Sequence, residues 1–597
     1  MSQYIVTLKT HDDLDDFYGD MEGSSGTDNI PSRQCECLAR KPISRCTLYD
    51  LTDDEASKLK NDSRVRAVEN PLSDDIVDGL CGWTQTGNFE KSETSIESDD
   101  KDWGLFRTEN GATSSGWGSD GTTEITRTIN TTSSGKNVDV VIIDAHMNFD
   151  HPEFTLNPDG SGGSRAKQYN WFQWNYLMGS AIANSWPSTY IYDSTTDNTN
   201  LFESHGTHVA GIACGNTQGW ARDANIYNMS FSTTGWGQSY SDGQPLGTWN
   251  LFMWDYIRMF HKNKPINPET GRRNPTICNN SWGRYYNFRN PITTPTTYGA
   301  NVYISEITSV TYRGTTTAVT GSTQQRRAIL EANGIPVHFS SAGVILGIPA
   351  RNAYLDSECE DCIADGIIMV GASGNEGIPI TRDDSDADWD NSFTFFNAGS
   401  QQSTVYYPYR GKTPTSCDGH ICVGAIESTV GEYKTFFSNY DKRVDVWAAG
   451  QHIISSVGTP RDPYGNVSAY AVSANDSRNS EGNNNYKISS ISGTSMASPQ
   501  VTGYLACLLE QEPNLTPAEA LQHLIEISKN NIADAGASNP HTYPFETLGN
   551  SPNRWLFYQK KRPVYGVAYP STIKKNRNPT TNGVKYPRSS SLVTKTS

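Results

Sequence analysis

The chain has 597 residues, of which 35 % are hydrophobic and 19 % are charged, and its formal net charge is −17. This length can bury a large core, and the composition excludes a coiled coil, a collagen and a highly charged disordered chain. No apolar run approaches the roughly 18 residues of a membrane span, since even the stretch from Val138 to Ile143 is broken by Asp139, so we expect no membrane partner.

The beginning of the chain predicts a small α+β domain over residues 1–75. Its first residues contain neither a basic leader nor an apolar segment, so we expect no signal peptide and an intracellular or assembly-associated location, such as a virus particle. Alternating β-branched and aromatic residues predict strands at Tyr4–Leu8, Cys46–Leu51 and Val65–Val68. Thr52 and Glu55 have the spacing of a capping box, which predicts a short helix between the last two strands.

Residues 76–101 are predicted to be a linker. Seven of the nine residues from Ser92 to Asp100 are Ser, Glu or Asp, and such a composition cannot bury a core. The nearly continuous β-branched run at Val138–Ile143 is then typical of a strand buried on both faces of a parallel sheet. Similar runs predict further strands at Val337–Phe339, Gly366–Val370 and Ile421–Ala425, with helical segments between them. The predicted fold class is α/β, with a parallel sheet flanked by helices.

Two polar residues lie at the ends of predicted elements, in positions suited to catalysis. Asp144 comes directly after the buried strand, where the carboxyl ends of parallel strands form a crevice. The string Glu203–Gly211 predicts a helix that begins against the sheet, with His205 at the N-terminus of the helix. We interpret His208, one turn further on, as a packing or capping group.

The string from Ser492 to Pro499 opens another helix. Its apolar residues fall on one helical face, at Val501, Tyr504, Leu505, Leu508 and Leu509. Ser495 therefore lies at a helix N-terminus, where free N–H groups and the positive end of the dipole favour an oxyanion. For a serine considered alone, the ordinary alternative is an N-cap.

In chain order, the strings around Asp144, His205 and Ser495 resemble those of the subtilisin-like serine proteases over roughly residues 102–530. The resemblance implies a subtilisin-like parallel sheet and an Asp-His-Ser triad that hydrolyses peptide bonds through an acyl-enzyme. It also implies that Asn375, in the string Gly371–Gly377, donates to the oxyanion. The chain departs from the family at Ala145 and His146, where Ser or Thr and then Gly are usual.

The resemblance extends to the substrate and to the start of the chain. It implies that a polypeptide substrate binds Ser281, Trp282 and Gly283, with Ala372, Ser373 and Gly374 as walls of the specificity pocket. The segments Leu51–Lys60 and Val65–Glu69 resemble an inhibitory propeptide, which makes the chain's own propeptide a second partner. The chain is then a zymogen, and we expect self-cleavage between about Leu72 and Trp103.

No metal ligand is assigned. Five aspartates between Asp383 and Asp390 could chelate calcium, favour a basic substrate or be solvated, and Trp389 stands where an EF-hand requires Gly. The family's calcium loop is short between Gly215 and Arg222, so we predict no required cofactor and leave calcium open.

Eleven cysteines fit reduced thiols better than a disulfide scaffold. Cys359 and Cys362 form a lone CxxC, which is a weak zinc signal, and Cys417 and Cys422 are close enough in sequence to pair.

The net charge is distributed unevenly between body and tail. Residues 554–597 carry ten Lys and Arg and no acid, which leaves −27 for the rest, and this acidic body should repel nucleic acid. The basic tail is interpreted as a solvated segment or a docking arm for a partner.

The predicted domains are a propeptide-like domain at 1–75, a linker at 76–101, a catalytic domain with insertions at 102–535 and a basic tail at 536–597.

A second function belongs to a different class of protein. It is a subtilase-like structural or peptide-binding component of a virus particle or another assembly, in which the enzyme is silent. The intact triad and Asn375 favour the endopeptidase, whereas the expected lack of a signal peptide and the tail keep the assembly role open.

Overall fold

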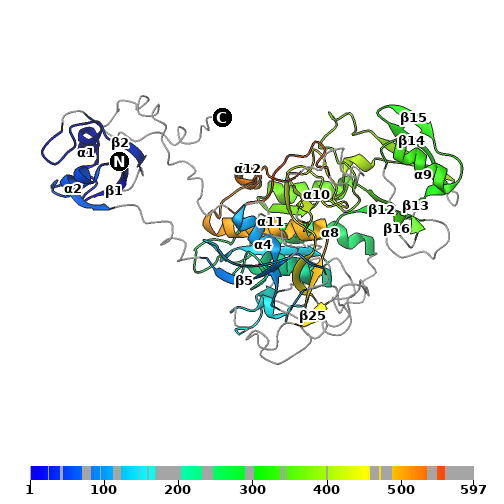
Figure 1. Cartoon of the computed structure of the whole chain (residues 1–597), viewed down its shortest axis with the longest axis horizontal. Helices are drawn as coiled ribbons and strands as arrows, with labels where there is room; N and C mark the ends of the chain where they lie inside the picture. Colours follow the sequence, from blue (N-terminus) through cyan, green and yellow to red (C-terminus); the bar gives the residue numbers. More distant parts are fainter. Residues whose placement is uncertain are drawn as a thin grey trace. The chain divides into compact units, whose positions relative to one another are not determined.

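The computed structural model of the chain divides into two units, which are described separately (Figure 1). One unit contains residues 1–81 and 559–597, and the other contains residues 82–558. The structure describes residues 2–23, 26–40, 45–69, 82–93, 96–97, 99–111, 123–144, 147–157, 161–167, 204–230, 246–289, 302–335, 339–340, 343–344, 346–397, 401–429, 431–457, 469–471, 487–533 and 547–558.

The described part of the first unit is a four-stranded antiparallel sheet with two helices. The strand order is β2-β3-β1-β4, and β1 pairs antiparallel with both β3 and β4, as in two interleaved split βαβ units. The capping box of Thr52 and Glu55 is present, and all three predicted strands are confirmed, whereas α1 and β2 were not predicted. The elements are β1 (Ser2–Leu8), α1 (Leu14–Glu22), β2 (Glu36–Arg40), β3 (Cys46–Leu51), α2 (Asp53–Leu59) and β4 (Val65–Glu69).

A seven-stranded parallel sheet organises the second unit, with the order β23-β22-β19-β11-β8-β10-β9. The α/β fold class is therefore confirmed, and so are the predicted strands at β8, β19 and β22. In chain order the strands are β8 (Asp139–Asp144), β9 (Ala166–Lys167), β10 (Asn225–Ser230), β11 (Thr276–Asn280), β19 (Ile368–Ala372), β22 (Ile421–Ile426) and β23 (Val446–Ala449).

Helices cover both faces of this sheet. Val140 and Ile142 of β8 belong to the core on one face, and Val141 and Ile143 belong to the core on the other. This alternation explains why the strand is apolar along its length. The first core contains α7 (Ser204–Cys214) and α11 (Thr494–Gln511), and the second contains α8 (Leu246–Asn263) and α10 (Ala353–Ala364).

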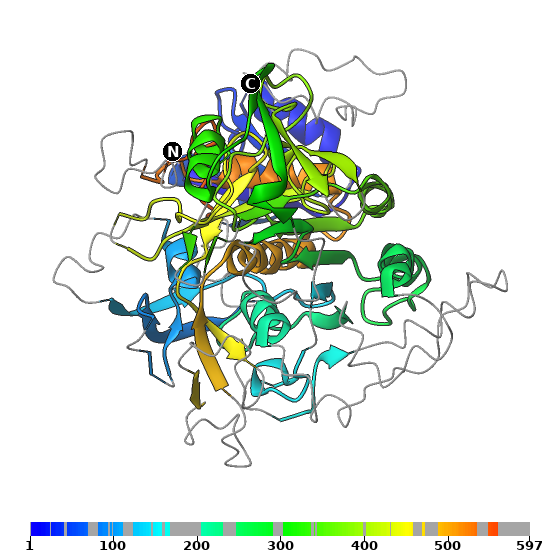
Figure 2. The ribbon, with the colours of Figure 1, turned by 90° about the vertical axis from the view of Figure 1, so that its right-hand side faces the viewer.

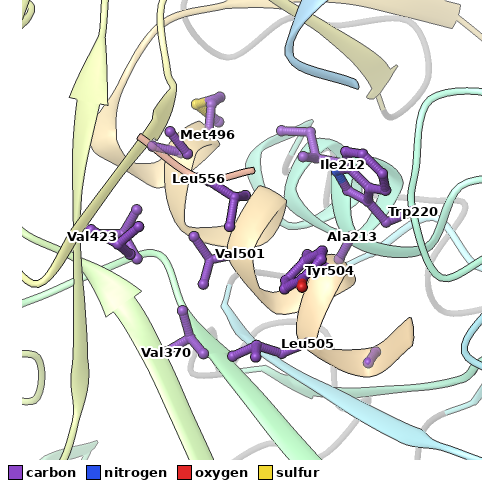
Figure 3. Packing of buried hydrophobic residues seen from close by; sticks show 14 of the residues in the cluster. Ile212, Ala213, Trp220, Val370, Val423, Met496, Val501, Tyr504, Leu505 and Leu556 are labelled. Carbon is purple, nitrogen blue, oxygen red and sulfur yellow. The ribbon is translucent and has the colours of Figure 1, made fainter. Parts of the chain in front are cut away.

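Helix α11 lies at the centre of this unit and is orange in Figure 2. Figure 3 shows Val501 and Leu505 of α11 near Val370 and Val423 of the sheet, with Tyr504 on the side of Ala213 in α7. The predicted apolar face of α11 is thus buried. No helix among the described residues is long and apolar enough to cross a membrane.

The predicted linker at 76–101 is wrong from residue 82 onward. Strand β5 (Thr84–Glu90) pairs antiparallel with β7 (Glu124–Asn130) and parallel with β6 (Lys101–Asp102). Lys91 is buried and its ammonium lies 2.9 Å from the Glu432 carboxylate, which also accepts a 2.6 Å hydrogen bond from Arg107. A polar composition does not reveal such backbone pairing or a buried ion pair, and this segment belongs to the second unit.

The boundary predicted between 535 and 536 is also wrong. Trp555 is fully buried, the Trp447 amide donates to the Arg554 carbonyl at 2.8 Å, and the Leu556 amide donates back to the Trp447 carbonyl. The second unit therefore continues to Tyr558, because these residues pair with β23. Residues 559–597, most of the predicted tail, lie outside the described residues.

The remaining elements lie outside the large sheet. The strand predicted at Val337–Phe339 is only partly described, and β16 (Phe339–Ser340) pairs with β17 (Gly343–Val344) instead of with the parallel sheet. The others are α4 (Trp103–Asn110), β12 (Tyr285–Arg289), β13 (Val302–Tyr303), β14 (Ile307–Tyr312), β15 (Thr315–Ala318), α9 (Thr323–Ala332), β18 (Leu346–Pro349), β20 (Ser392–Asn397), β21 (Gln402–Tyr406), β24 (Ile453–Val457), β25 (Ala469–Ala471), β26 (Lys487–Ile491) and α12 (Pro517–Ile527).

Candidate active site

Three neighbouring strands bring the candidate residues to one edge of the sheet. β8, β11 and β19 are adjacent and parallel, so their carboxyl ends lie side by side. Asp144 is the last residue of β8, Ser281 follows β11, and Asn375 follows β19 by three residues. The predicted crevice residues, which are up to 231 positions apart in sequence, thus meet because the strands are parallel.

Asp144 and His205 form a hydrogen-bonded pair. Their Oδ1 and Nδ1 atoms are 2.7 Å apart, the Asp144 side chain is fully buried, and 22 % of the His205 side chain is exposed. His205 is the second residue of α7, as the sequence predicts. The carboxylate orients the ring and engages Nδ1, so exchange of a proton with a substrate falls to Nε2.

Ser495 is the second residue of α11, and the N-cap of that helix is Gly493. The N-cap alternative for Ser495 is therefore wrong. The Ser495 hydroxyl donates to the Ser281 carbonyl at 2.9 Å, and the Ser281 hydroxyl donates to the Ser495 carbonyl at 2.7 Å. This reciprocal pair joins the start of α11 to the segment that follows β11.

Asn375 is held by the residue before Ser495. Its Oδ1 atom accepts hydrogen bonds from the Thr494 amide at 2.9 Å and from the Thr494 hydroxyl at 2.8 Å. The Gly374 amide in turn donates to the Thr494 hydroxyl at 3.2 Å. Because its oxygen is engaged with α11, the exposed Asn375 side chain has its NH₂ group left to donate hydrogen bonds.

The predicted substrate-binding segments are neighbours. Asn280 is the register partner of Gly371, so residues 281–283 and 372–374 emerge side by side from β11 and β19. Ser373 is buried and donates to the Asn439 carbonyl at 3.2 Å. The ring of Trp282 stacks on that of Trp254 in α8, at 6.3 Å between centroids, so one of its faces is used in packing.

Two supporting residues were not singled out from the sequence. Thr494 orients Asn375, and buried Asn279 donates to the Ser281 hydroxyl at 2.8 Å while it accepts from Ser498 at 2.8 Å. Thr494 lies inside the string Ser492–Pro499, and Asn279 lies two residues before the predicted Ser281, so both are next to residues that the sequence had identified. Their side-chain partners are more than a hundred residues away, except for Ser281.

His208 is buried and its Nε2 atom lies 3.0 Å from the Ser489 carbonyl. Burial lowers the pKa of His208 to about 3, so this ring is neutral at physiological pH. The packing role predicted for His208 agrees with this environment. Ala145 and His146, where the chain departs from the family string, lie outside the described residues.

The short loop after α7 is built around an internal cation. The guanidinium of buried Arg165 donates to the carbonyls of Cys214 at 2.6 Å, Ala224 at 2.8 Å and Thr155 at 3.0 Å, and to Asn216 Oδ1 at 3.1 Å. These oxygens are of the kind that calcium prefers, and the guanidinium occupies them. The described residues contain no group of three or more His, Cys, Asp or Glu that could hold a metal ion.

Three of the five aspartates after Asn375 are paired with basic side chains. Hydrogen-bonded ion pairs join Asp386 to Lys442, Asp388 to Arg313 and Asp390 to Arg410, at 2.6 to 2.7 Å. These pairs support a structural interpretation of the segment.

The cysteines of the CxxC string lie in the core. Cys359 and Cys362 are buried on α10, and burial raises the pKa of both thiols well above the usual range. Such thiols resist the deprotonation that zinc binding requires. Cys417 and Cys422, which were considered as a disulfide pair, are both free and buried.

Comparison with known proteins identifies a family. Residues 135–543 match the model of the subtilase family. "Subtilisin-like protease 8" of Arthroderma otae is 32 % identical over 140 residues, which are 22 % of this chain and 23 % of that protein. Subtilisin DY of Bacillus licheniformis is 26 % identical over 185 residues, which are 31 % of this chain and 48 % of that protein. The chain spans between 23 % and 36 % of the length of the first three curated relatives.

A solved structure is also similar. It is described as a cold adapted subtilisin-like serine proteinase and is 19 % identical in sequence, with a TM-score of 0.37. The match covers 72 % of this chain and 91 % of that chain.

Proposed function

The chain belongs to the subtilase family, and from this premise we propose that it is a serine endopeptidase that hydrolyses polypeptides through an acyl-enzyme. One observation carries the proposal: the 2.7 Å pair of Asp144 and His205 lies at the same edge of the sheet as Ser495 and Asn375. Each of these residue types has a role in acyl transfer that the others cannot fill.

The proposed reaction begins when a peptide pairs with the segment after β11. An extended substrate offers backbone N–H groups, and one of these can replace the Ser495 hydroxyl as the donor to the Ser281 carbonyl. The released hydroxyl then turns to His205, which takes its proton as Oγ attacks the substrate carbonyl. Asp144 stabilises the imidazolium that forms, and His205 returns the proton to the leaving amine.

Charge on the attacked oxygen is met by the start of α11. The Ser495 amide lies in the first turn of the helix, where it has no intrahelical acceptor, and the Asn375 NH₂ group is oriented by Thr494. Water then hydrolyses the acyl-enzyme: His205 takes a proton from the attacking water and returns it to Ser495, which is now the leaving group. Because only neutral imidazole accepts the proton, the rate should rise with pH as His205 loses its own proton.

The first unit is proposed to be an inhibitory propeptide. Support comes from its compact sheet with its own core and from the division of the chain between residues 81 and 82, which places this sheet in a unit apart from the site. Because β5 and β6 pair within the second unit, we place the self-cleavage before Thr84, in the first part of the range predicted from the sequence.

A fluorophosphonate probe tests the endopeptidase. It should label the wild-type chain at Ser495 and fail to label Ser495→Ala, and only the wild type should hydrolyse denatured casein. The Ser495→Ala chain should stay full length by mass spectrometry if the cut is made by the chain itself. An unlabelled, inactive but folded wild type would favour the structural or peptide-binding role, and a cut Ser495→Ala chain would assign processing to another protease.

A further inference from the structure

A buried lysine lies beside Gly283, in one predicted wall of the specificity pocket, and near Glu376, two residues after the other wall. Lys412 is 6 % exposed, and a Cβ atom added at Gly283 would clash with its Cγ, Cδ and Cε atoms. Its ammonium is 3.9 Å from Oε1 of Glu376, the residue next to Asn375. Lys412 thus lies next to both the segment after β11 and the segment after β19.

The backbone around Lys412 is fixed by hydrogen bonds. Its amide donates to the Ser416 hydroxyl at 3.0 Å, and its carbonyl accepts from the Ser416 amide at 2.8 Å. The next residue, Thr413, accepts from the Arg284 amide at 3.0 Å and donates to the Ala350 carbonyl at 3.2 Å. Arg284 directly follows Gly283, so the lysine is tied to the substrate-binding segment by its main chain as well.

The ammonium differs from those of the other buried lysines that the structure describes. Lys91, Lys101, Lys264 and Lys434 all donate hydrogen bonds to protein oxygens from Nζ. Within the described residues, Lys412 has only the Glu376 carboxylate at 3.9 Å, beyond hydrogen-bond range. Although the side chain is buried, Nζ itself keeps access to solvent, so its unused donors are suited to an acceptor that arrives with a ligand.

The Glu376 carboxylate is engaged elsewhere. Its Oε2 atom accepts a hydrogen bond from Asn439 Nδ2 at 2.5 Å, and its side chain is 9 % exposed. Asn439 also donates to the Ser373 carbonyl at 3.0 Å, so Glu376 is fixed to the same wall. Glu376 balances the charge of Lys412 in the free protein, and the unused donors at this place belong to the lysine.

We propose that Lys412 determines specificity by binding the carboxylate of an acidic residue, Glu or Asp, that contributes the scissile carbonyl of the substrate. This inference rests on the proposed endopeptidase function. The side chain of that substrate residue must lie near the segments that hold its carbonyl, and these are residues 281–283 and 372–376. A carboxylate there completes the hydrogen bonding of the ammonium with a charge-assisted bond.

Matched peptide substrates test the proposal. Tetrapeptide p-nitroanilides that differ only in Glu or Gln before the scissile bond have the same shape and differ in charge. At pH 8 the wild type should cleave the Glu peptide with a kcat/KM at least about tenfold higher than the Gln peptide, the effect of one charge-assisted hydrogen bond. Lys412→Met should remove this preference, and Lys412→Arg should keep a preference for Glu.

Two further variants distinguish the effect of charge next to Lys412 from the effect of a charge elsewhere on the protein. Glu376→Gln removes the competing carboxylate and should raise the Glu-to-Gln ratio above the wild-type value. Lys136→Met removes an exposed ammonium that pairs with Glu269 on the surface, and it should leave the ratio unchanged. If Lys412→Met does not fold, the ratios of the wild type and of Glu376→Gln still decide the matter.

The outcomes distinguish this inference from the proposed function. Cleavage of both peptides by the wild type at equal rates, or faster cleavage of the Gln peptide, would overturn the role of Lys412 alone. Fluorophosphonate labelling would still support the endopeptidase in that case. If no peptide is cleaved and no label is taken up, the endopeptidase itself is overturned, and the inference with it.

Discussion

The two ends of strand β8 carry buried aspartates with opposite surroundings. At the start, Asp139 accepts from Lys264 at 2.7 Å, Asn225 at 2.8 Å and Asn274 at 2.9 Å, and both charged side chains are almost completely buried. At the end, Asp144 pairs with His205, whose ring is partly exposed. Asp139 thus has its hydrogen bonds filled by buried protein groups, whereas Asp144 is hydrogen-bonded to a ring that solvent can reach.

This difference separates a charged pair that serves the fold from the pair that we propose to be catalytic. The ammonium of Lys264 is enclosed, and burial lowers its pKa, so the pair at the start of β8 serves the fold. An imidazole that changes protonation near neutral pH and reaches solvent can pass a proton to a substrate. The carboxyl end of a parallel strand is also where the loops leave room for a ligand.

The largest effect is expected at the carboxyl end. Asp144→Asn removes the charge that orients and stabilises His205, and kcat should fall by about 10⁴-fold, the loss known for this change in another serine protease triad. The melting temperature should change little. Peptidase kinetics and thermal unfolding measured on the same sample check both parts. A variant with near-normal kcat would contradict the role of Asp144.

The matched substitution at the other end should have the opposite outcome. Asp139→Asn leaves the Lys264 ammonium buried without its counter-ion, and the free energy of unfolding should fall by about 3–5 kcal/mol. Activity of the folded fraction well below the melting temperature should remain close to that of the wild type. Denaturant unfolding and kcat at low temperature measure the two quantities. A large loss of kcat in a folded Asp139→Asn protein would break the distinction between the two ends.

A third buried carboxyl should make stability depend on pH. Burial raises the pKa of Asp102, the N-cap of α4, to about 7, against an ordinary value near 4 for an unfolded chain. Between these values the unfolded chain releases a proton that the folded chain retains, so this contribution to stability is complete below pH 4 and is lost as pH rises through 7.

The Asp102→Asn variant isolates that effect. The melting temperature of the wild type should fall relative to that of the variant between pH 5 and pH 8, whatever the constant offset between them. The exposed Asp54→Asn substitution in the first unit is the control and should show no such trend. Parallel pH curves for the wild type and Asp102→Asn would argue against the raised pKa.

The smallest effect is expected from metal removal. Because the Arg165 guanidinium already binds the carbonyl oxygens around the loop after α7, a chelator should not change the melting temperature of the second unit. Arg165 then belongs with Lys264 among the saturated buried cations. Thermal unfolding with and without EDTA, followed by addition of calcium, makes the measurement. A melting temperature that falls with EDTA and recovers with calcium would reveal a metal site.

Local sequence predicted the elements that carry the chemistry. The strand ending at Asp144, the helix opening at His205 and the helix with Ser495 in its first turn all follow from hydrophobic periodicity and short polar strings. These signals are local, because a strand buried on both faces or a helix with one buried face imposes its pattern on neighbouring residues. The capping box at Thr52 was predictable for the same reason.

Only the tertiary structure decided which polar residues are partners. Residues 76–101 were interpreted as a linker from their polar composition, because the acceptor of Lys91 is Glu432, 341 positions away, and leaves no local signal. The sequence around Lys412 gave no sign of its proposed role. That role depends on Gly283 and Glu376, which come close to Lys412 only when β11 and β19 pair. Composition and periodicity report how each element buries its own apolar face, whereas the cost of a buried charge depends on distant atoms that only folding brings to it.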